Sequence, residues 1–206
     1  KGGVPPNIGS RHRFKFFNDG PNDLHLFISR DGIKFSRPSR WPYIGLGICG
    51  NDDGGCLLSG LGMLCSNSEL WQYYTAFKVT HGAVVGSGRN VAKIYRAVQR
   101  LDGFVSVDAD HSGGEFTTPV LVFEGSKLEL NIDCSALGET WVEIQDEKGR
   151  TFQGYAMKDC DPVDLNHTSV TVTWKNNSDV SNLQEKPVRL RFKMRLSKLY
   201  SFGFRK

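Results

Sequence analysis

The sequence has no long apolar segment and lacks the motifs of several common enzyme classes. Its 206 residues hold no run of about 18 apolar residues, the length that a membrane-spanning helix needs, so we expect no membrane span. Gly-x-Ser-x-Gly, Gly-x-x-x-x-Gly-Lys and His-Glu-x-x-His are all missing, which argues against the corresponding serine hydrolase, nucleotide and zinc protease sites. The Gly-rich segment Val84–Asn90 lacks the Lys and the following apolar helix that phosphate binding would need.

The cysteines do not have the spacing of a metal site. There are five of them, at positions 49, 56, 65, 134 and 160, with no Cys-x-x-Cys pair and no pair of His residues nearby. We therefore expect no zinc site, no other metal and no cofactor. An odd number cannot be paired completely within one chain. A disulfide between Cys134 and Cys160 and a set of buried free thiols are both compatible with the sequence.

Positive charge is concentrated in the first half of the chain. Residues 1–103 carry 13 Lys and Arg against 7 Asp and Glu, whereas the rest carries 13 against 15. This excess would suit an anionic ligand such as an acidic glycan, or it forms an ordinary solvated strand face. Nucleic acid is not an expected partner, because no basic-aromatic recognition motif accompanies the charge. The excess clusters at Arg11, Arg13, Lys15, Arg30, Lys34, Arg37 and Arg40.

Alternating apolar and polar residues with Gly-containing turns predict an all-β protein. The segment DLHLFISRDGIKF alternates and turns at Asp31-Gly32, as a hairpin does. In PVRLRFKMR, Val188, Leu190 and Phe192 would share one face of a strand. From about Phe104 onward short strands recur at regular intervals, which is typical of an antiparallel β-sandwich. We expect two β units, residues 1–103 and 104–206.

The segment NVAKIYRAVQRL allows two interpretations. Val91, Ile94, Tyr95, Val98 and Leu101 have helical spacing, and this pattern slightly favours a helix. The same residues also alternate as a strand does.

Several segments resemble a known family. LHLFISRDGIKFSRP, WPYIGLG, NDDGG, ELWQYYTAF and THG resemble the last blades of a five-bladed β-propeller in bacterial glycoside-hydrolase-like proteins. The segment from RLDGFVSVDADHSGGEF to KLYSFGF resembles the β-sandwich that follows the propeller in uncharacterised members. The resemblance implies partial propeller-like sheets followed by a β-sandwich, with residues 91–101 as a strand. It also implies that Asp31 shapes its turn, with Gly32 at positive φ and Phe35 packed inside.

The resemblance implies a carbohydrate ligand and two candidate catalytic carboxyl groups. Glycoside hydrolysis uses one carboxyl group as an acid and a second as a base or nucleophile. Asp53, in GNDDGG, and Glu69, in SELWQYY, are the candidates. Asp52 could bind substrate beside Asp53. The alternative for both Asp residues is an ordinary Asp-Gly loop, and for Glu69 an exposed position at the start of a strand.

Aromatic residues and one histidine are candidates for sugar contacts. Trp41, Trp71 and Tyr73 could stack on pyranose rings, and His81 could bind a sugar hydroxyl. Alternation instead places at least half of Trp71, Tyr73 and Tyr74 in the core, and His81 could simply be a loop residue.

The length argues against a complete catalytic propeller. Five blades need roughly 250 to 300 residues, and only about 100 precede the expected sandwich. We therefore expect a carbohydrate-binding, glycoside-hydrolase-like protein or a C-terminal piece of one, without catalysis on its own. Missing N-terminal blades or an oligomer would complete the propeller, and the first residue, Lys1, fits a truncated N-terminus. The alternative is a non-catalytic β-sandwich module that binds sugar or protein.

Overall fold

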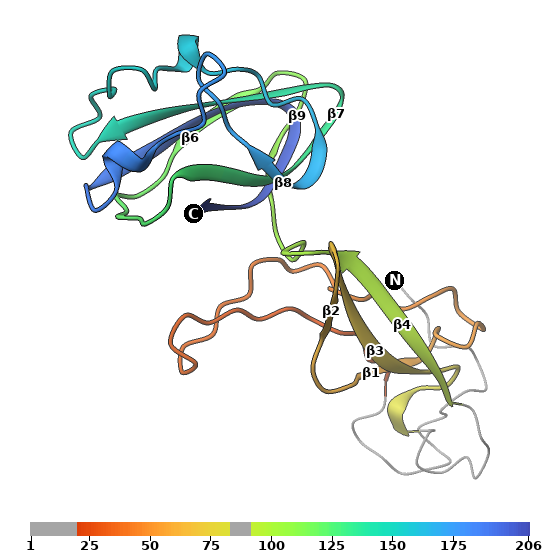
Figure 1. Cartoon of the computed structure of the whole chain (residues 1–206). Coiled ribbons are helices and arrows are strands. Elements are labelled where there is room, and N and C mark those ends of the chain that lie inside the picture. Colours follow the sequence, from red (N-terminus) through yellow and green to blue (C-terminus); the bar gives the residue numbers. More distant parts are fainter. Residues whose placement is uncertain (1–19, 83–91) are drawn as a thin grey trace. The chain divides into compact units, whose positions relative to one another are not determined.

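The computed structural model describes residues 20–82 and 92–206 and is all-β, with two antiparallel sheets, neither closed into a barrel (Figure 1). The chain divides into two compact units, Lys1–Gln99 (unit 1) and Arg100–Lys206 (unit 2). The sequence had suggested a division after residue 103. Arg11, Arg13, Lys15 and the Gly-rich segment Val84–Asn90 lie outside the described residues.

Unit 1 contains a small sheet built around one long strand, β3 (Glu69–Phe77). β1 (Cys56–Ser59) pairs with residues 74–77 of β3, and β2 (Leu64–Ser66) pairs with residues 69–71. The loop between β1 and β2 leaves this edge at Gly60, where a Cβ would lie 2.7 Å from the carbonyl oxygen of Tyr73. β4 (Ala92–Arg100) also pairs with β3.

The ambiguous segment 91–101 is a strand over all of its described regular part, β4. Tyr95 stacks on Tyr74 of β3, with ring centroids 5.6 Å apart. Arg96, the next residue, lies instead over the indole of Trp71, which is the alternation that a strand imposes. The strand expectation is confirmed and the helical pattern was misleading.

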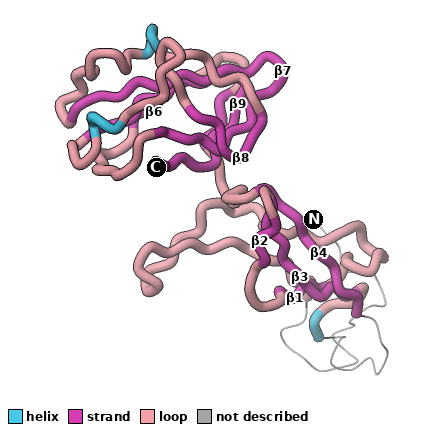
Figure 2. The backbone as a smooth tube through the Cα atoms, viewed as in Figure 1, coloured by secondary structure: helices cyan, strands magenta, loops and turns pink. Residues whose placement is uncertain are grey.

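The first 36 described residues of unit 1 are mostly loop, as Figure 2 shows, and are held by isolated bridges. One bridge joins Ile28 and Ser36 around the Asp31-Gly32 turn. The carboxylate of Asp31 accepts hydrogen bonds from the N–H groups of Ile33 and Lys34, at 2.9 and 2.7 Å, and Gly32 has φ +70°. The expected role of Asp31 in the turn is confirmed. The expectation for Phe35 is wrong, since its side chain is 62% exposed.

Unit 2 is organised by two long antiparallel strands, β7 (Lys127–Asp146) and β9 (Val188–Arg205), which run side by side in Figure 1. β8 (Asn166–Thr171) pairs with the free edge of β7. β5 (Val107–Ala109) and β6 (Gly114–Thr117) pair with the other edge of β9. Two short 3₁₀ turns, Met157–Asp159 and Ser181–Leu183, lie in the connections.

The core of unit 2 lies on one face of this sheet. Val188, Leu190 and Phe192 are fully buried, which confirms the face predicted for this strand. Buried residues from the connections cover the core from the other side, giving a sandwich-like arrangement. The indole N–H of Trp174, in one of these connections, donates to the carbonyl oxygen of Val142 at 2.9 Å. These covering residues include Phe123, Tyr155, Cys160, Val163, Val172, Trp174, Val180 and Leu183.

All five cysteines are free thiols. The Sγ of Cys134 lies 3.3 Å from the carbonyl oxygen of Val163, whereas the Sγ of Cys160 accepts from the N–H of Val142 at 3.2 Å. The two sulfur atoms therefore have separate partners in the core, and the disulfide alternative is not realised.

Candidate functional site

The two aspartates of the GNDDGG segment brace a loop of unit 1. Asp52 Oδ2 forms an ion pair with Lys93 Nζ of β4 at 2.5 Å, and this contact raises the pKa of Lys93. The Asp53 carboxylate occupies the space that a Cβ at Gly47 would need. Burial, followed by the negative charge of Asp53, raises the pKa of Tyr74. Asp53 therefore lies by the face of the sheet that carries Tyr74.

Glu69 lies on the opposite face of the same sheet. Residues 69 and 74 are five apart in β3, so their side chains point to opposite faces and their backbones are separated by about 17 Å. Glu69 Oε2 accepts from the indole N–H of Trp71 at 2.8 Å. A hydrolytic pair would need carboxyl groups about 5 to 10 Å apart across one bond. The structure does not bring Asp53 and Glu69 together in this way.

The face with Glu69 also carries Trp71 and Tyr73. The guanidinium carbon of Arg96 lies 4.2 Å from the Trp71 ring centroid, so one side of this indole is covered. Tyr73 is 43% exposed and Ile94, on β4, is 77% exposed. Three predicted site residues thus share a face whose aromatic platform is already partly occupied by Arg96.

The other two predicted sugar contacts lie in loops of unit 1. Trp41 is 83% exposed, and its backbone N–H donates to the Ser39 hydroxyl oxygen at 3.1 Å. The Nδ1 atom of His81 lies 2.9 Å from the carbonyl oxygen of Gly20, which is a contact that fastens the loop. Neither Trp41 nor His81 lines the hollow beside the Asp31 turn or the hollow on the unit 2 sheet.

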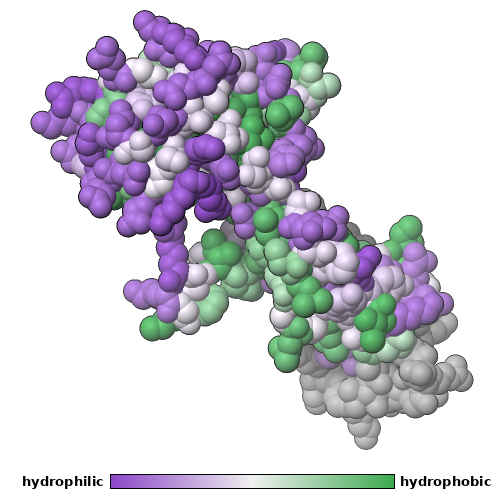
Figure 3. Space-filling view, in the orientation of Figure 1, coloured by the Kyte–Doolittle hydropathy of each residue, from purple (hydrophilic) through white to green (hydrophobic). Residues whose placement is uncertain are grey.

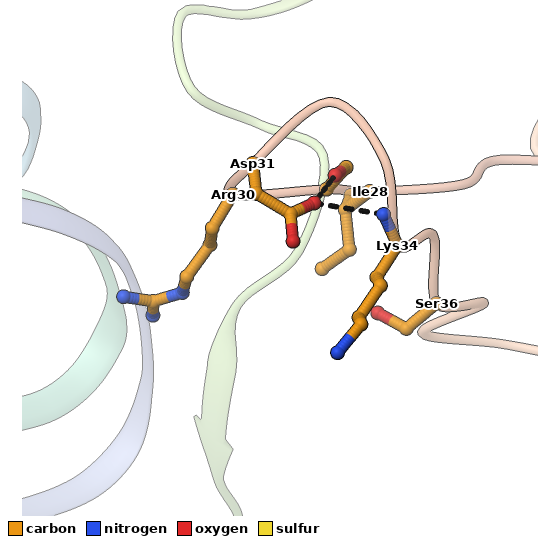
Figure 4. Close-up of a pocket in the computed structure, with 6 residues that line it drawn as sticks. Ile28, Arg30, Asp31, Lys34 and Ser36 are labelled. Atoms are coloured by element: carbon orange, nitrogen blue, oxygen red, sulfur yellow. Dashed lines mark hydrogen bonds between the residues drawn. The ribbon is translucent and has the colours of Figure 1, made fainter.

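A hollow of about 370 Å³ lies beside the Asp31 turn and is lined by the basic residues Arg30 and Lys34 (Figure 4). Their side chains point in different directions from the turn, so their charges do not converge. Arg37, further along the basic segment, contacts His25 Nδ1 at 2.6 Å and the Ser39 carbonyl oxygen at 3.1 Å. The contacts of Arg37 thus hold the loop together, and Arg30 and Lys34 do not form a joint anion site.

A second hollow, of about 400 Å³, lies on the outer face of the unit 2 sheet. Glu115, Lys193 and Trp141 are register partners on β6, β9 and β7, and form one row across three strands. Their neighbours in sequence Phe116, Phe192 and Val142 pack inward, so alternation directs the row to the outer face. Glu115 and Lys193 are exposed there, whereas Trp141 is half-buried and also packs against the core. The other lining residues of this hollow, which we call the Trp141 groove, are Ser112, Gly113, Gly114, Met194 and Arg195.

Gly113 gives the Trp141 groove its shape on the β6 side. Its φ is +71°, and a Cβ there would lie 2.9 Å from the carbonyl oxygen of Met194. Only glycine lets the chain approach β9 so closely at this angle. The sequence analysis did not identify this groove. The alternation in TWVEIQD was the available signal, because it places Trp141 on the face opposite to the buried Val142 and Ile144.

The charges around the Trp141 groove are unequally compensated. Arg191 holds Glu115 Oε2 through Nε at 3.1 Å and Nη2 at 2.5 Å, and this contact raises the pKa of Arg191. Lys193 Nζ lies over the Trp141 ring, 5.6 Å from its centroid, so the ammonium partly covers this indole as Arg96 covers Trp71. Arg195 Nη2 is 3.5 Å from the nearest carboxylate oxygen, that of Glu139. The groove therefore combines an aromatic ring with two cationic groups, Lys193 and Arg195, whose N–H donors are only partly used.

Among residues 20–82 and 92–206, no group of three or more His, Cys, Asp or Glu side chains is placed to hold a metal ion. In the same residues no helix is long and apolar enough to cross a membrane. Figure 3 shows that the visible surface around β6 to β9 is mainly hydrophilic, whereas hydrophobic side chains are more frequent around β1 to β4. Comparisons of the chain with protein-family models, with curated proteins and with solved structures find no match.

Proposed function

We propose that this chain binds carbohydrate without cleaving it, and that the Trp141 groove is its binding site. One observation carries the proposal: the half-buried Trp141 lines a hollow of about 400 Å³ in a row with Lys193 and Glu115. Hollows of roughly 300 to 1,000 Å³ are the usual size of small-ligand sites.

The chemistry of the groove suits a sugar. A pyranose presents C–H groups on its face, which pack on an indole, and hydroxyl groups at its rim, which need hydrogen-bond partners. Lys193 and Arg195 supply donors, and Glu115 supplies an acceptor oxygen. An aromatic surface with a few polar groups beside it is the arrangement by which binding sites fix the orientation of a ligand.

The same groove gives no support to hydrolysis. Of the residues that line it, Glu115 alone carries a carboxyl group, and that group is held by Arg191. Glycoside hydrolysis uses two carboxyl groups on opposite sides of the bond. The resemblance to glycoside-hydrolase-like propeller proteins enters the proposal only as support for a carbohydrate ligand.

Affinity electrophoresis tests the proposal with the full chain. The chain is run in native gels that contain soluble neutral or acidic polysaccharides, beside Trp141→Ala and the matched variant Trp41→Ala, which removes an exposed indole of unit 1. We expect at least one polysaccharide to retard the wild type and Trp41→Ala but not Trp141→Ala, with no release of reducing sugar. Retardation of none of the proteins, or equal retardation of Trp141→Ala, would refute the proposal.

A further inference from the structure

We infer that the ligand of the Trp141 groove is an anionic glycan, in which a sugar carries a carboxylate or a sulfate group. This inference rests on the proposed function and adds the charge of the ligand to it. It depends on how the charged side chains that line the groove are already engaged.

The one acidic side chain in the groove is neutralised. Glu115 Oε2 accepts two hydrogen bonds from Arg191, whose Nη1 also lies 3.7 Å from Glu143 on the neighbouring strand. Arg191 and Glu115 are both 41% exposed, so they form a pair at the edge of the groove. Glu115 therefore adds little negative potential to the groove.

The two cations of the groove, Lys193 and Arg195, are less neutralised than Glu115. Lys193 Nζ forms no ion pair with any residue of 20–82 or 92–206, and its charge lies over the Trp141 ring. Arg195 meets Glu139 at 3.5 Å, a long single contact between side chains that are 41% and 40% exposed. A ligand with a negative group beside the indole would meet an ammonium and a guanidinium whose donors are largely available.

The position of Lys193 favours an anionic sugar over a free anion. Its register partner on β7 is Trp141, so a sugar packed on the indole would present its ring substituents beside the ammonium. Arg30 and Lys34 of unit 1 lack this combination, because their side chains diverge and no aromatic residue lines their hollow. Charge and stacking therefore coincide in the Trp141 groove.

The test uses two pairs of polymers that differ only in charge. Polygalacturonate is compared with its methyl ester, and dextran sulfate with dextran, by affinity electrophoresis and calorimetry on the full chain. We expect one anionic member to bind more tightly than its neutral counterpart, and Lys193→Gln to weaken that binding about tenfold, as for one charge-assisted hydrogen bond. The matched variants Lys198→Gln, elsewhere on β9, and Lys34→Gln, at the unit 1 turn, should bind as the wild type does.

Each result is decisive. Preference for polygalacturonate identifies a carboxylate ligand, and preference for dextran sulfate identifies a sulfated one, if Lys193→Gln removes the preference. Equal binding of the charged and neutral members would overturn the anionic inference and leave the proposed function standing. A preference removed by Lys34→Gln and not by Lys193→Gln would overturn it as well. Failure of every polysaccharide to bind would refute the proposed function itself.

Discussion

The carboxylate of Glu143 accepts a hydrogen bond from the backbone N–H of Met157 at 3.0 Å and so fastens the connection after β7 to the strand. Glu143 is 7% exposed, and Gln145 Nε2 donates to it at 2.6 Å. Burial by itself would raise the pKa of Glu143, but the hydrogen bonds from Met157, Gln145 and Thr151 and the charge of Arg191 lower it. The ionised form is thus the one that the folded protein stabilises.

Glu143→Gln should reduce the pH dependence of stability. A carboxyl group with a lowered pKa in the folded state stabilises it above the ordinary value of 4.5, and this contribution is lost as the pH falls through the folded pKa. Urea unfolding at pH 7 should show a loss of about 1 to 2 kcal/mol in the variant, and the difference from the wild type should shrink toward pH 3. The control is Glu147→Gln, in the adjacent exposed turn. A difference that stays constant from pH 7 to pH 3 would contradict this account.

Two of the five thiols should react in the native protein. Cys49 and Cys65 are exposed, whereas Cys56, Cys134 and Cys160 are buried. Burial raises the pKa of Cys160 to about 11, which removes its thiolate at pH 8. A chromogenic disulfide reagent should therefore label Cys49 and Cys65 quickly and all five thiols in denaturant, with mass spectrometry identifying the sites. Rapid native labelling of Cys160 would show that the core of unit 2 is not as described.

Gly32→Ala should destabilise the Asp31 turn. Gly32 has φ +70°, where an L-residue costs about 1 to 2 kcal/mol, although a Cβ would meet nothing within 4 Å. The matched variant Gly45→Ala has no positive φ, and its Cβ would make an ordinary contact of 3.9 Å with Pro42. Hydrogen exchange of the Ile28 and Ser36 amides, which bond across the turn, should accelerate in Gly32→Ala alone. Equal exchange in the two variants would mean that the turn does not depend on this backbone angle.

Local patterns predicted much of the fold. Alternation correctly predicted that Val188, Leu190 and Phe192 lie on the buried face of β9. The Asp31-Gly32 pair correctly predicted a turn. Both predictions succeeded because each signal lies within a few residues of the chain. Segment 91–101 carried helical and strand periods at once, and only its pairing with β3 decided the outcome. Phe35 was misplaced because the turn leaves the side chain exposed, which a residue pattern does not encode.

The site depended on register, which the sequence does not reveal. Trp141, Lys193 and Glu115 are separated by more than 20 residues from one another, and pairing of β6, β9 and β7 alone aligns them. Asp53 and Glu69 were grouped by residue type, but strand alternation through Tyr74 places them by opposite faces of one sheet. Candidate catalytic pairs therefore need the register before their chemistry can be judged.

The indole N–H resonances of the four tryptophans test binding at the Trp141 groove most directly. They are recorded in the ¹⁵N-labelled full chain during titration with oligogalacturonate and with its methyl ester, and Trp141 is assigned from its absence in Trp141→Phe. The account predicts a saturable shift of the Trp141 resonance with at least one of these ligands, while the buried Trp174 stays unchanged. A Trp141 resonance unmoved by either, or a shift confined to Trp41 or Trp71, would contradict it.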